Sequence, residues 1–105
     1  MNYYIYYWKD IDYIHGDRVP KTKEEFNKDY AFVGNMHFPM HEENHLEEIY
    51  MHYNRDDNPL STLEGQEKIK SLNVNHTSMS VGDIIECAKG TYIVDVTGFK
   101  KIRIT

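Results

Sequence analysis

The sequence predicts a single α+β domain: a mostly antiparallel sheet that ends in a C-terminal three-stranded meander, with one principal amphipathic helix packed on it. Two observations predict this class. Three short runs of apolar and β-branched residues, joined by two-residue turns, fill the end of the chain, and a helical repeat of apolar residues lies upstream. A length of 105 residues fits one domain, residues 1–105, with one hydrophobic core.

The meander is predicted from its turns. Gly90 and Gly98 each close a two-residue connection, where a tight hairpin demands a positive φ that glycine adopts easily. Both glycines are flanked by residues that favour strands. The three predicted strands cover residues 83–88, 91–96 and 99–104.

The first strand is predicted over residues 3–8, where aromatic or aliphatic side chains occupy both faces. Such a strand is typical of the interior of a sheet. The alternative is an exposed stacking platform for nucleic-acid bases, but that platform needs basic residues along the backbone and only Lys9 is near. We therefore expect a core strand.

A short helix and a second strand follow. Thr22 and Glu25 match a capping box, which predicts a helix over residues 23–29. From Tyr30 the apolar period becomes two, which predicts a strand that stops before Pro39. The residues expected on one side of that strand are Tyr30, Phe32, Gly34, Met36 and Phe38.

The principal helix is predicted over residues 46–53, with Asn44 as N-cap and Glu47 at the acidic position of a capping box. Residues 60–75 are expected to form a connection with one short helix near 64–71. The apolar stripe of the principal helix consists of Leu46, Ile49, Tyr50 and Tyr53.

Three segments in order carry a family resemblance: LEEIYMHYNRDDNP at 46–59, SMSVGDII at 78–85 and TYIVDVTGF at 91–99. Together they resemble the YodL-like domain family. The resemblance implies a small α+β domain of bacteria, phages and conjugative elements, found in proteins that counter host defence, and it implies no catalytic residues. Two features depart from the family: Thr77 stands where His or Arg is common, and the link at 60–75 is longer.

The box at 78–85 has an architectural interpretation. Ser78 and Ser80 can bond local backbone, Gly82 permits an unusual φ, and Asp83 can cap the turn. The alternative makes Ser78 or Ser80 a nucleophile with His76 as base. That chemistry also needs an orienting acid and an oxyanion hole, and no strand–elbow–helix context supplies them. The structural motif is completed by Gly98 and Phe99.

Three histidines, His37, His41 and His45, recur every four residues, as in zinc-binding helices. Pro39 and the predicted cap at Asn44 separate them into different elements. We therefore expect solvated histidines, with no metal and no cofactor.

Charge points to a protein partner. The chain has a net charge of −5, and residues 1–60 hold six Lys/Arg against twelve Asp/Glu. This balance disfavours direct nucleic-acid binding, because phosphate contacts need Lys and Arg. The carboxylates expected to bind a basic surface surround the principal helix: Glu42, Glu43, Glu47, Glu48, Asp56 and Asp57.

These observations lead to one functional expectation and two alternatives. We expect a non-enzymatic protein-binding domain from a phage or mobile element, a counter-defence inhibitor of which an anti-CRISPR protein is one form. Its partner would be a basic bacterial protein, such as a CRISPR or other defence effector, in the bacterial cytoplasm. A lone cysteine fits that reducing compartment. The sequence has no long apolar segment, so we expect no association with a membrane. The alternatives are a small enzyme or nucleic-acid-processing accessory using His76 with Ser78 or Ser80, and a host regulatory or structural interaction module.

Overall fold

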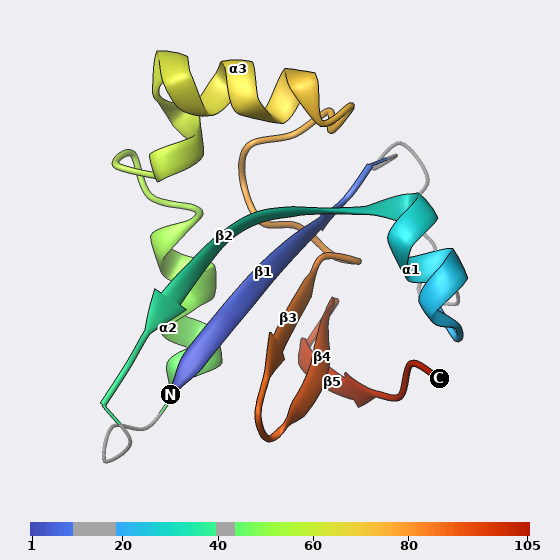
Figure 1. Cartoon of the computed structure of the whole chain (residues 1–105). Helices are drawn as coiled ribbons and strands as arrows, with labels where there is room; N and C mark the ends of the chain where they lie inside the picture. Colours follow the sequence, from blue (N-terminus) through green and yellow to red (C-terminus); the bar gives the residue numbers. More distant parts are fainter. Residues whose placement is uncertain (10–18, 40–43) are drawn as a thin grey trace.

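A five-stranded antiparallel sheet organises the computed structural model, which describes residues 1–9, 19–39 and 44–105 (Figure 1). The strand order is β2-β1-β3-β4-β5. This arrangement confirms the α+β class and the mostly antiparallel sheet. The elements are β1 (Asn2–Trp8), α1 (Lys23–Asp29), β2 (Tyr30–His37), α2 (His45–His52), η1 (Pro59–Ser61), α3 (Leu63–Ser71), β3 (Ile84–Cys87), β4 (Gly90–Asp95) and β5 (Gly98–Ile102).

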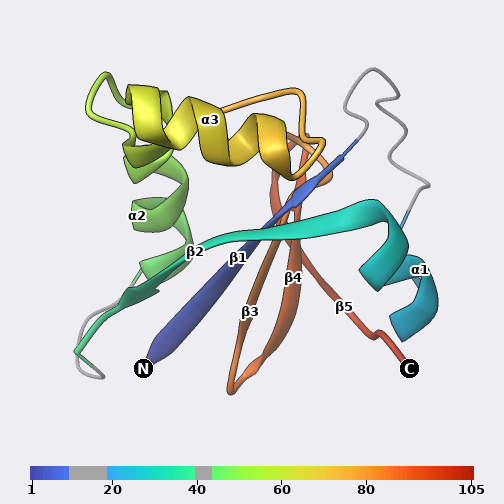
Figure 2. The same cartoon turned by 45° about the horizontal axis from the view of Figure 1, so that its top comes forward.

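The predicted meander is confirmed by β3, β4 and β5, which pair in sequence (Figure 2). Ile84 lies opposite Ile93, and Val94 lies opposite Phe99. Gly98 adopts a φ of 129° at the second turn, a value that side-chain-bearing residues avoid. Local turn chemistry thus sets the register of this ribbon.

Strand β1 lies inside the sheet, between β2 and β3, as its aromatic pattern predicted. Tyr3, Ile5 and Tyr7 point into the main core, and each is at most 5% exposed. On the opposite face Trp8 is buried, whereas Tyr4 is 38% exposed. The strand is therefore covered fully on one face and only partly on the other.

Strand β2 corrects the predicted alternation. The pairing of β1 with β2 shifts between Ile5 and Tyr6, and this irregularity leaves Val33 as an extra residue. Val33 consequently joins the main core, whereas Phe32 lies on the opposite face and is 45% exposed. The predicted single side is thus divided between two faces. Tyr30 lies in the smaller core, whereas Met36 and Phe38 pack against the main core. The five residues predicted for one side were Tyr30, Phe32, Gly34, Met36 and Phe38.

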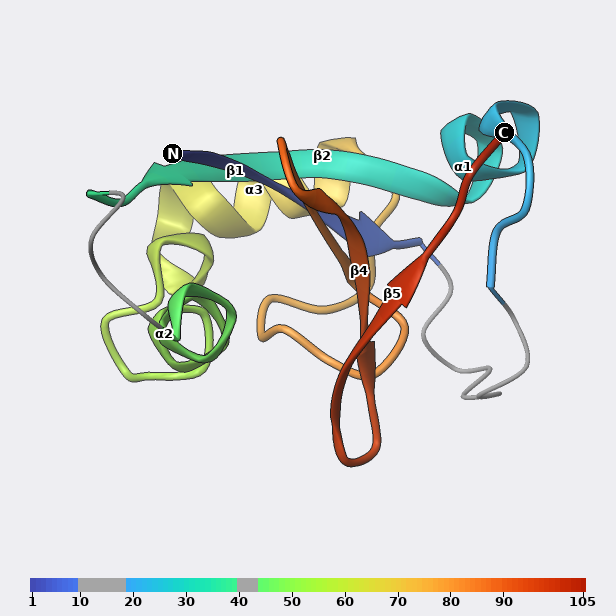
Figure 3. The same cartoon turned by 90° about the horizontal axis from the view of Figure 1, so that it is seen from below.

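Helices α2 and α3 lie on the same side of the β1–β2 pair (Figure 3). Ile49 and Tyr53 of α2, together with Ile69 of α3, are buried in the main core. The principal helix and the short helix near 64–71 are therefore confirmed. Tyr50, predicted for the apolar stripe, is 37% exposed, and His45 is buried instead.

The start of α2 differs from the expected capping box. Asn44 adopts a left-handed conformation, with φ 60° and ψ 35°, and its side chain makes no capping hydrogen bond within the part of the chain that the structure describes. Capping by the side chain needs extended backbone at that position, which Thr22 does have at the start of α1. Thr22 accepts a hydrogen bond from the Glu25 amide at 3.2 Å, as predicted.

In the ranges that the structure describes, none of the helices combines the length and the apolar character required to cross a membrane.

Candidate functional site

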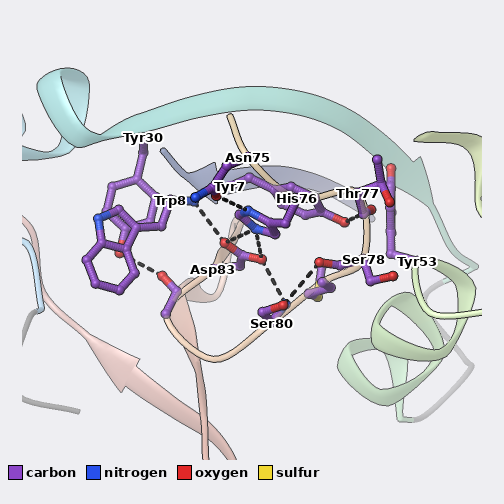
Figure 4. A network of polar contacts seen from close by, with 12 residues as sticks. Tyr7, Trp8, Tyr30, Tyr53, Asn75, His76, Thr77, Ser78, Ser80 and Asp83 are labelled. Atoms are coloured by element: carbon purple, nitrogen blue, oxygen red, sulfur yellow. Dashed lines mark hydrogen bonds and ion pairs between the residues drawn. The ribbon is translucent and has the colours of Figure 1, made fainter. Parts of the chain in front are cut away.

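The corner that precedes β3 contains a network of polar contacts (Figure 4). Asp83 is its centre and is fully buried. Its carboxylate accepts hydrogen bonds from the backbone amides of Trp8 and Ser80, each at 2.8 Å. The Asp83 amide in turn donates to the Ser80 carbonyl at 3.0 Å. This residue therefore caps the 80–83 turn and ties it to β1.

Gly82 occupies a position that other residues would strain. Its φ is 99°, and a Cβ built there would lie 2.9 Å from Cε3 of Trp8. Its amide donates to the carbonyl of Val94 at 2.9 Å, and its carbonyl accepts from the hydroxyl of Tyr30 at 2.6 Å. The turn is thus fixed between β4 and the start of β2.

His76 completes the corner with an ion-pair partner. Its Nε2 lies 2.9 Å from Oδ2 and 3.2 Å from Oδ1 of Asp83. The imidazole stacks on the ring of Tyr7, with centroids 4.6 Å apart and planes 9° apart. Burial raises the pKa of the Asp83 carboxyl, while hydrogen bonds from His76, Trp8 and Ser80 act in the opposite direction.

The geometry of the two serines differs from that of an activated nucleophile. The Ser80 hydroxyl donates to the Ser78 carbonyl at 3.2 Å, and neither hydroxyl bonds to His76 within the described chain. Both ring nitrogens of His76 face oxygens, because Nδ1 lies 3.2 Å from Oδ1 of Asn75. A serine nucleophile would need one of those nitrogens as its base. The arrangement can hold a turn and a buried charge.

Asn58 joins the end of α2 to this corner and was missed by the sequence reasoning. It is 2% exposed, and its amide donates to the carbonyls of Tyr53 at 2.7 Å and Thr77 at 2.8 Å. The Thr77 carbonyl also accepts from the Tyr7 hydroxyl at 2.9 Å. The available signal was an Asn directly before Pro59, which is typical of a cap and gives no hint of the distant bonds.

The other two residues of the predicted structural motif lie apart from Asp83, at the β4–β5 turn. Gly98 is exposed and begins β5. Phe99 packs against Tyr50 of α2, with ring centroids 6.3 Å apart. These residues shape the edge hairpin and contribute no group to the polar network.

The predicted partner-binding carboxylates lie at the two ends of α2. Glu47 and Glu48 occupy its first turn and are exposed. Asp56 and Asp57 follow its last turn and are also exposed, with Asp57 3.5 Å from the guanidinium of Arg55. We call these four carboxylates the acidic ridge. Glu42 and Glu43 lie outside the described residues.

The histidines are less solvated than predicted. His45 is buried because it faces the main core from the first turn of α2, and its Nδ1 lies 2.6 Å from the Tyr3 hydroxyl. Its Nε2 has no hydrogen-bond partner among the described residues. His76 is enclosed by the corner, whereas His37 is exposed and His41 lies outside the described residues. Across the described ranges, no three His, Cys, Asp or Glu side chains are placed to share a metal ion.

Part of this chain has a viral relative. It is 48% identical over 58 residues to an uncharacterized protein of Acanthamoeba polyphaga mimivirus, which is 55% of this chain and 53% of the relative. The chain thus matches about half the length of that curated protein. No family model and no solved structure matches the chain.

Proposed function

We propose that the chain is a non-enzymatic protein-binding domain whose acidic ridge docks on a basic surface of another protein. The observation that carries this proposal is the exposure of Glu47, Glu48, Asp56 and Asp57 around one short helix. Arg55 is the cation that the structure describes beside them, and it pairs with Asp57 at 3.5 Å. The ridge therefore keeps an excess of negative charge.

The ridge consists of two pairs of carboxylates. An eight-residue helix is about 12 Å long, which exceeds the Debye length of about 8 Å at physiological ionic strength, so the pair at each end of α2 acts as a separate negative patch. Each pair attracts the cations that face its own end of the helix. Such a surface accelerates encounter with a basic partner and rejects an acidic one.

Apolar side chains beside the carboxylates can supply the short-range contact. Tyr50 and Met51, both on α2, are 37% and 53% exposed. Aromatic and methionine side chains are enriched at the centres of protein interfaces, where desolvation provides most of the affinity. Helix α2 thus offers charge for steering and apolar surface for binding.

The corner favours this proposal over catalysis at His76, Ser78 and Ser80. The carboxylate of Asp83 is fully buried and already bonds two backbone amides and His76. These contacts cap a turn and hold it against β1, and they engage the Asp83 carboxylate in a structural role.

A counter-defence role completes the proposal. The partial match to an uncharacterized mimivirus protein supports a viral setting for this domain. A nucleic-acid groove of a defence nuclease, a CRISPR effector included, is positively charged and is the kind of surface that the acidic ridge would fit. We therefore propose inhibition by occupation of such a groove.

Affinity capture from a bacterial lysate tests the proposal. The full chain is immobilised as the native protein, as Glu47→Lys/Glu48→Lys, and as the matched control Glu64→Lys/Glu67→Lys on α3, which changes the net charge equally. We expect the first variant to lose the captured basic proteins and the control to retain them, with similar melting temperatures. Capture of the same proteins by all three forms would refute the proposal.

A further inference from the structure

The sheet face opposite α2 carries an aromatic surface that α1 covers only in part. Tyr4 and Phe32 are 38% and 45% exposed, and Tyr6 lies partly buried between them and α1. The rings of Tyr6 and Phe32 have centroids 5.5 Å apart, and those of Tyr4 and Phe32 are 6.4 Å apart. We call Tyr4, Tyr6 and Phe32 the outer aromatic patch.

Helix α1 explains why the patch is open at one end only. It lies beside the end of β2 that is far from the N-terminus (Figure 1). Phe26 of α1 contacts Tyr6 at 4.8 Å and Tyr30 at 5.3 Å between centroids, and it closes the smaller core there. Tyr4 lies nearer the other end of β1, and Phe32, which pairs with Tyr6 across the two strands, remains 45% exposed.

A carboxylate borders the patch. Glu86 of β3 is the cross-strand partner of Tyr4, and opposite residues of an antiparallel pair share a face. Burial raises the pKa of the Tyr6 hydroxyl, and the charge of Glu86 adds to that shift. Glu86 is partly buried and forms no ion pair or hydrogen bond with a described residue. A hollow of about 500 Å³ extends from Tyr4 and Glu86 toward Met1 and Ala88.

The cations on the neighbouring segments leave this carboxylate unpaired. Lys9 follows the far end of β1, and Lys89 lies in the turn after β3. The amino group of Met1 donates to the Phe38 carbonyl at 2.7 Å. None of them makes an ion pair with Glu86 in the described structure.

An aromatic surface bordered by a carboxylate favours the binding of a cation over the binding of a nucleic acid. The faces of aromatic rings carry partial negative charge and attract cations, and a carboxylate beside them adds to that attraction. The same carboxylate would repel the phosphates of a strand whose bases stacked on the rings. Large exposed apolar surfaces on soluble domains commonly mark binding sites.

We propose that the outer aromatic patch and Glu86 bind an arginine side chain of a partner protein. The planar guanidinium can stack on Tyr4 and Phe32 while its N–H groups donate to the carboxylate, a combination that a lysine ammonium cannot reproduce. This surface lies on the opposite face of the sheet from α2 and does not depend on the acidic ridge. The two proposals can therefore fail separately.

An NMR titration of the full chain tests the inference with two probes. Nα-acetyl-arginine amide carries the guanidinium, and Nα-acetyl-citrulline amide is its neutral counterpart of the same shape. We expect saturable shifts of the Tyr4 and Phe32 ring signals and the Glu86 amide with the arginine probe, and at least fivefold weaker binding of the citrulline probe. Equal responses to both probes, or no response at these residues, would overturn the inference.

Three variants and a second ligand, an oligonucleotide, extend the test. Glu86→Gln should weaken arginine binding three- to tenfold, whereas Glu64→Gln, an exposed glutamate on α3, should leave it unchanged. Phe32→Leu keeps an apolar side chain and removes the ring, so it should also weaken binding. Unchanged binding by both patch variants would contradict the assignment. So would saturable shifts at the patch caused by a ten-nucleotide oligothymidylate, which would indicate single-stranded nucleic acid instead.

Discussion

Removal of the Asp83 carboxylate is expected to cost a large part of the domain's stability. In Asp83→Ala the amides of Trp8 and Ser80 lose the acceptors that lie 2.8 Å from each of them. A buried donor without a partner costs about 1–3 kcal/mol, and breaking a buried pair such as that with His76 costs about 3–5 kcal/mol. We expect the free energy of unfolding to fall by about 3–5 kcal/mol.

Urea unfolding followed by circular dichroism measures this loss. With a total stability of about 5–15 kcal/mol, the variant should still fold except at the lower end of that range, and thermal melts should give a Tm lower by roughly 12 °C or more at about 4 °C per kcal/mol. Asp95→Ala is the control, because the Asp95 carboxylate accepts from the adjacent Val96 amide at the surface, and it should cost about 1 kcal/mol or less. If Asp83→Ala does not fold, Asp83→Asn replaces it in the test. Asp83→Asn retains one acceptor oxygen, so its loss of unfolding free energy should lie between the losses expected for Asp83→Ala and Asp95→Ala. A loss below about 1 kcal/mol in both Asp83 variants would refute the reasoning.

Two further predictions concern the same corner. Burial raises the pKa of Asp83 above its unfolded value of about 3.9, so the stability that proton binding to Asp83 contributes is complete below that pH and is lost as the pH rises through the folded pKa. The native protein should therefore lose stability relative to Asp83→Asn when the pH is raised from about 4. Urea titrations that showed a gain would contradict the assigned direction. Gly82→Ala should lower the Tm more than Gly98→Ala does. Both glycines have a positive φ, but a Cβ at Gly82 meets the Trp8 ring at 2.9 Å, whereas a Cβ at Gly98 meets no atom of the described residues within 4 Å. Equal costs would show that backbone strain alone matters.

Elements specified by neighbouring residues could be predicted from the sequence. The turns at Gly90 and Gly98 define the meander, and the Thr22 side chain caps α1 as its spacing to Glu25 indicates. The apolar repeat that includes Ile49 likewise indicated α2. Each of these signals acts within a few residues, where propensity and hydrogen bonding are local.

Features that depend on distant contacts could not be predicted. The irregularity that turns Phe32 outward exists only when β2 pairs with β1. The serine box suggested a corner, but the bond of Asp83 to the Trp8 amide joins residues 75 positions apart. The partnership of His76 with Asp83 needs that corner to be formed first. Residue types alone could not indicate these pairings, because they result from tertiary packing.

The most direct test of the account combines capture with thermal stability for two variants of the full chain. The central claim is that the acidic ridge binds a partner while Asp83 holds the fold. We predict that Glu47→Lys/Glu48→Lys loses capture with a Tm within roughly 4 °C of the native protein, a difference of about 1 kcal/mol. Asp83→Asn should lower the Tm and retain capture at a temperature where it remains folded. The opposite pattern, with capture lost in Asp83→Asn and kept in the charge-reversed ridge, would contradict the account.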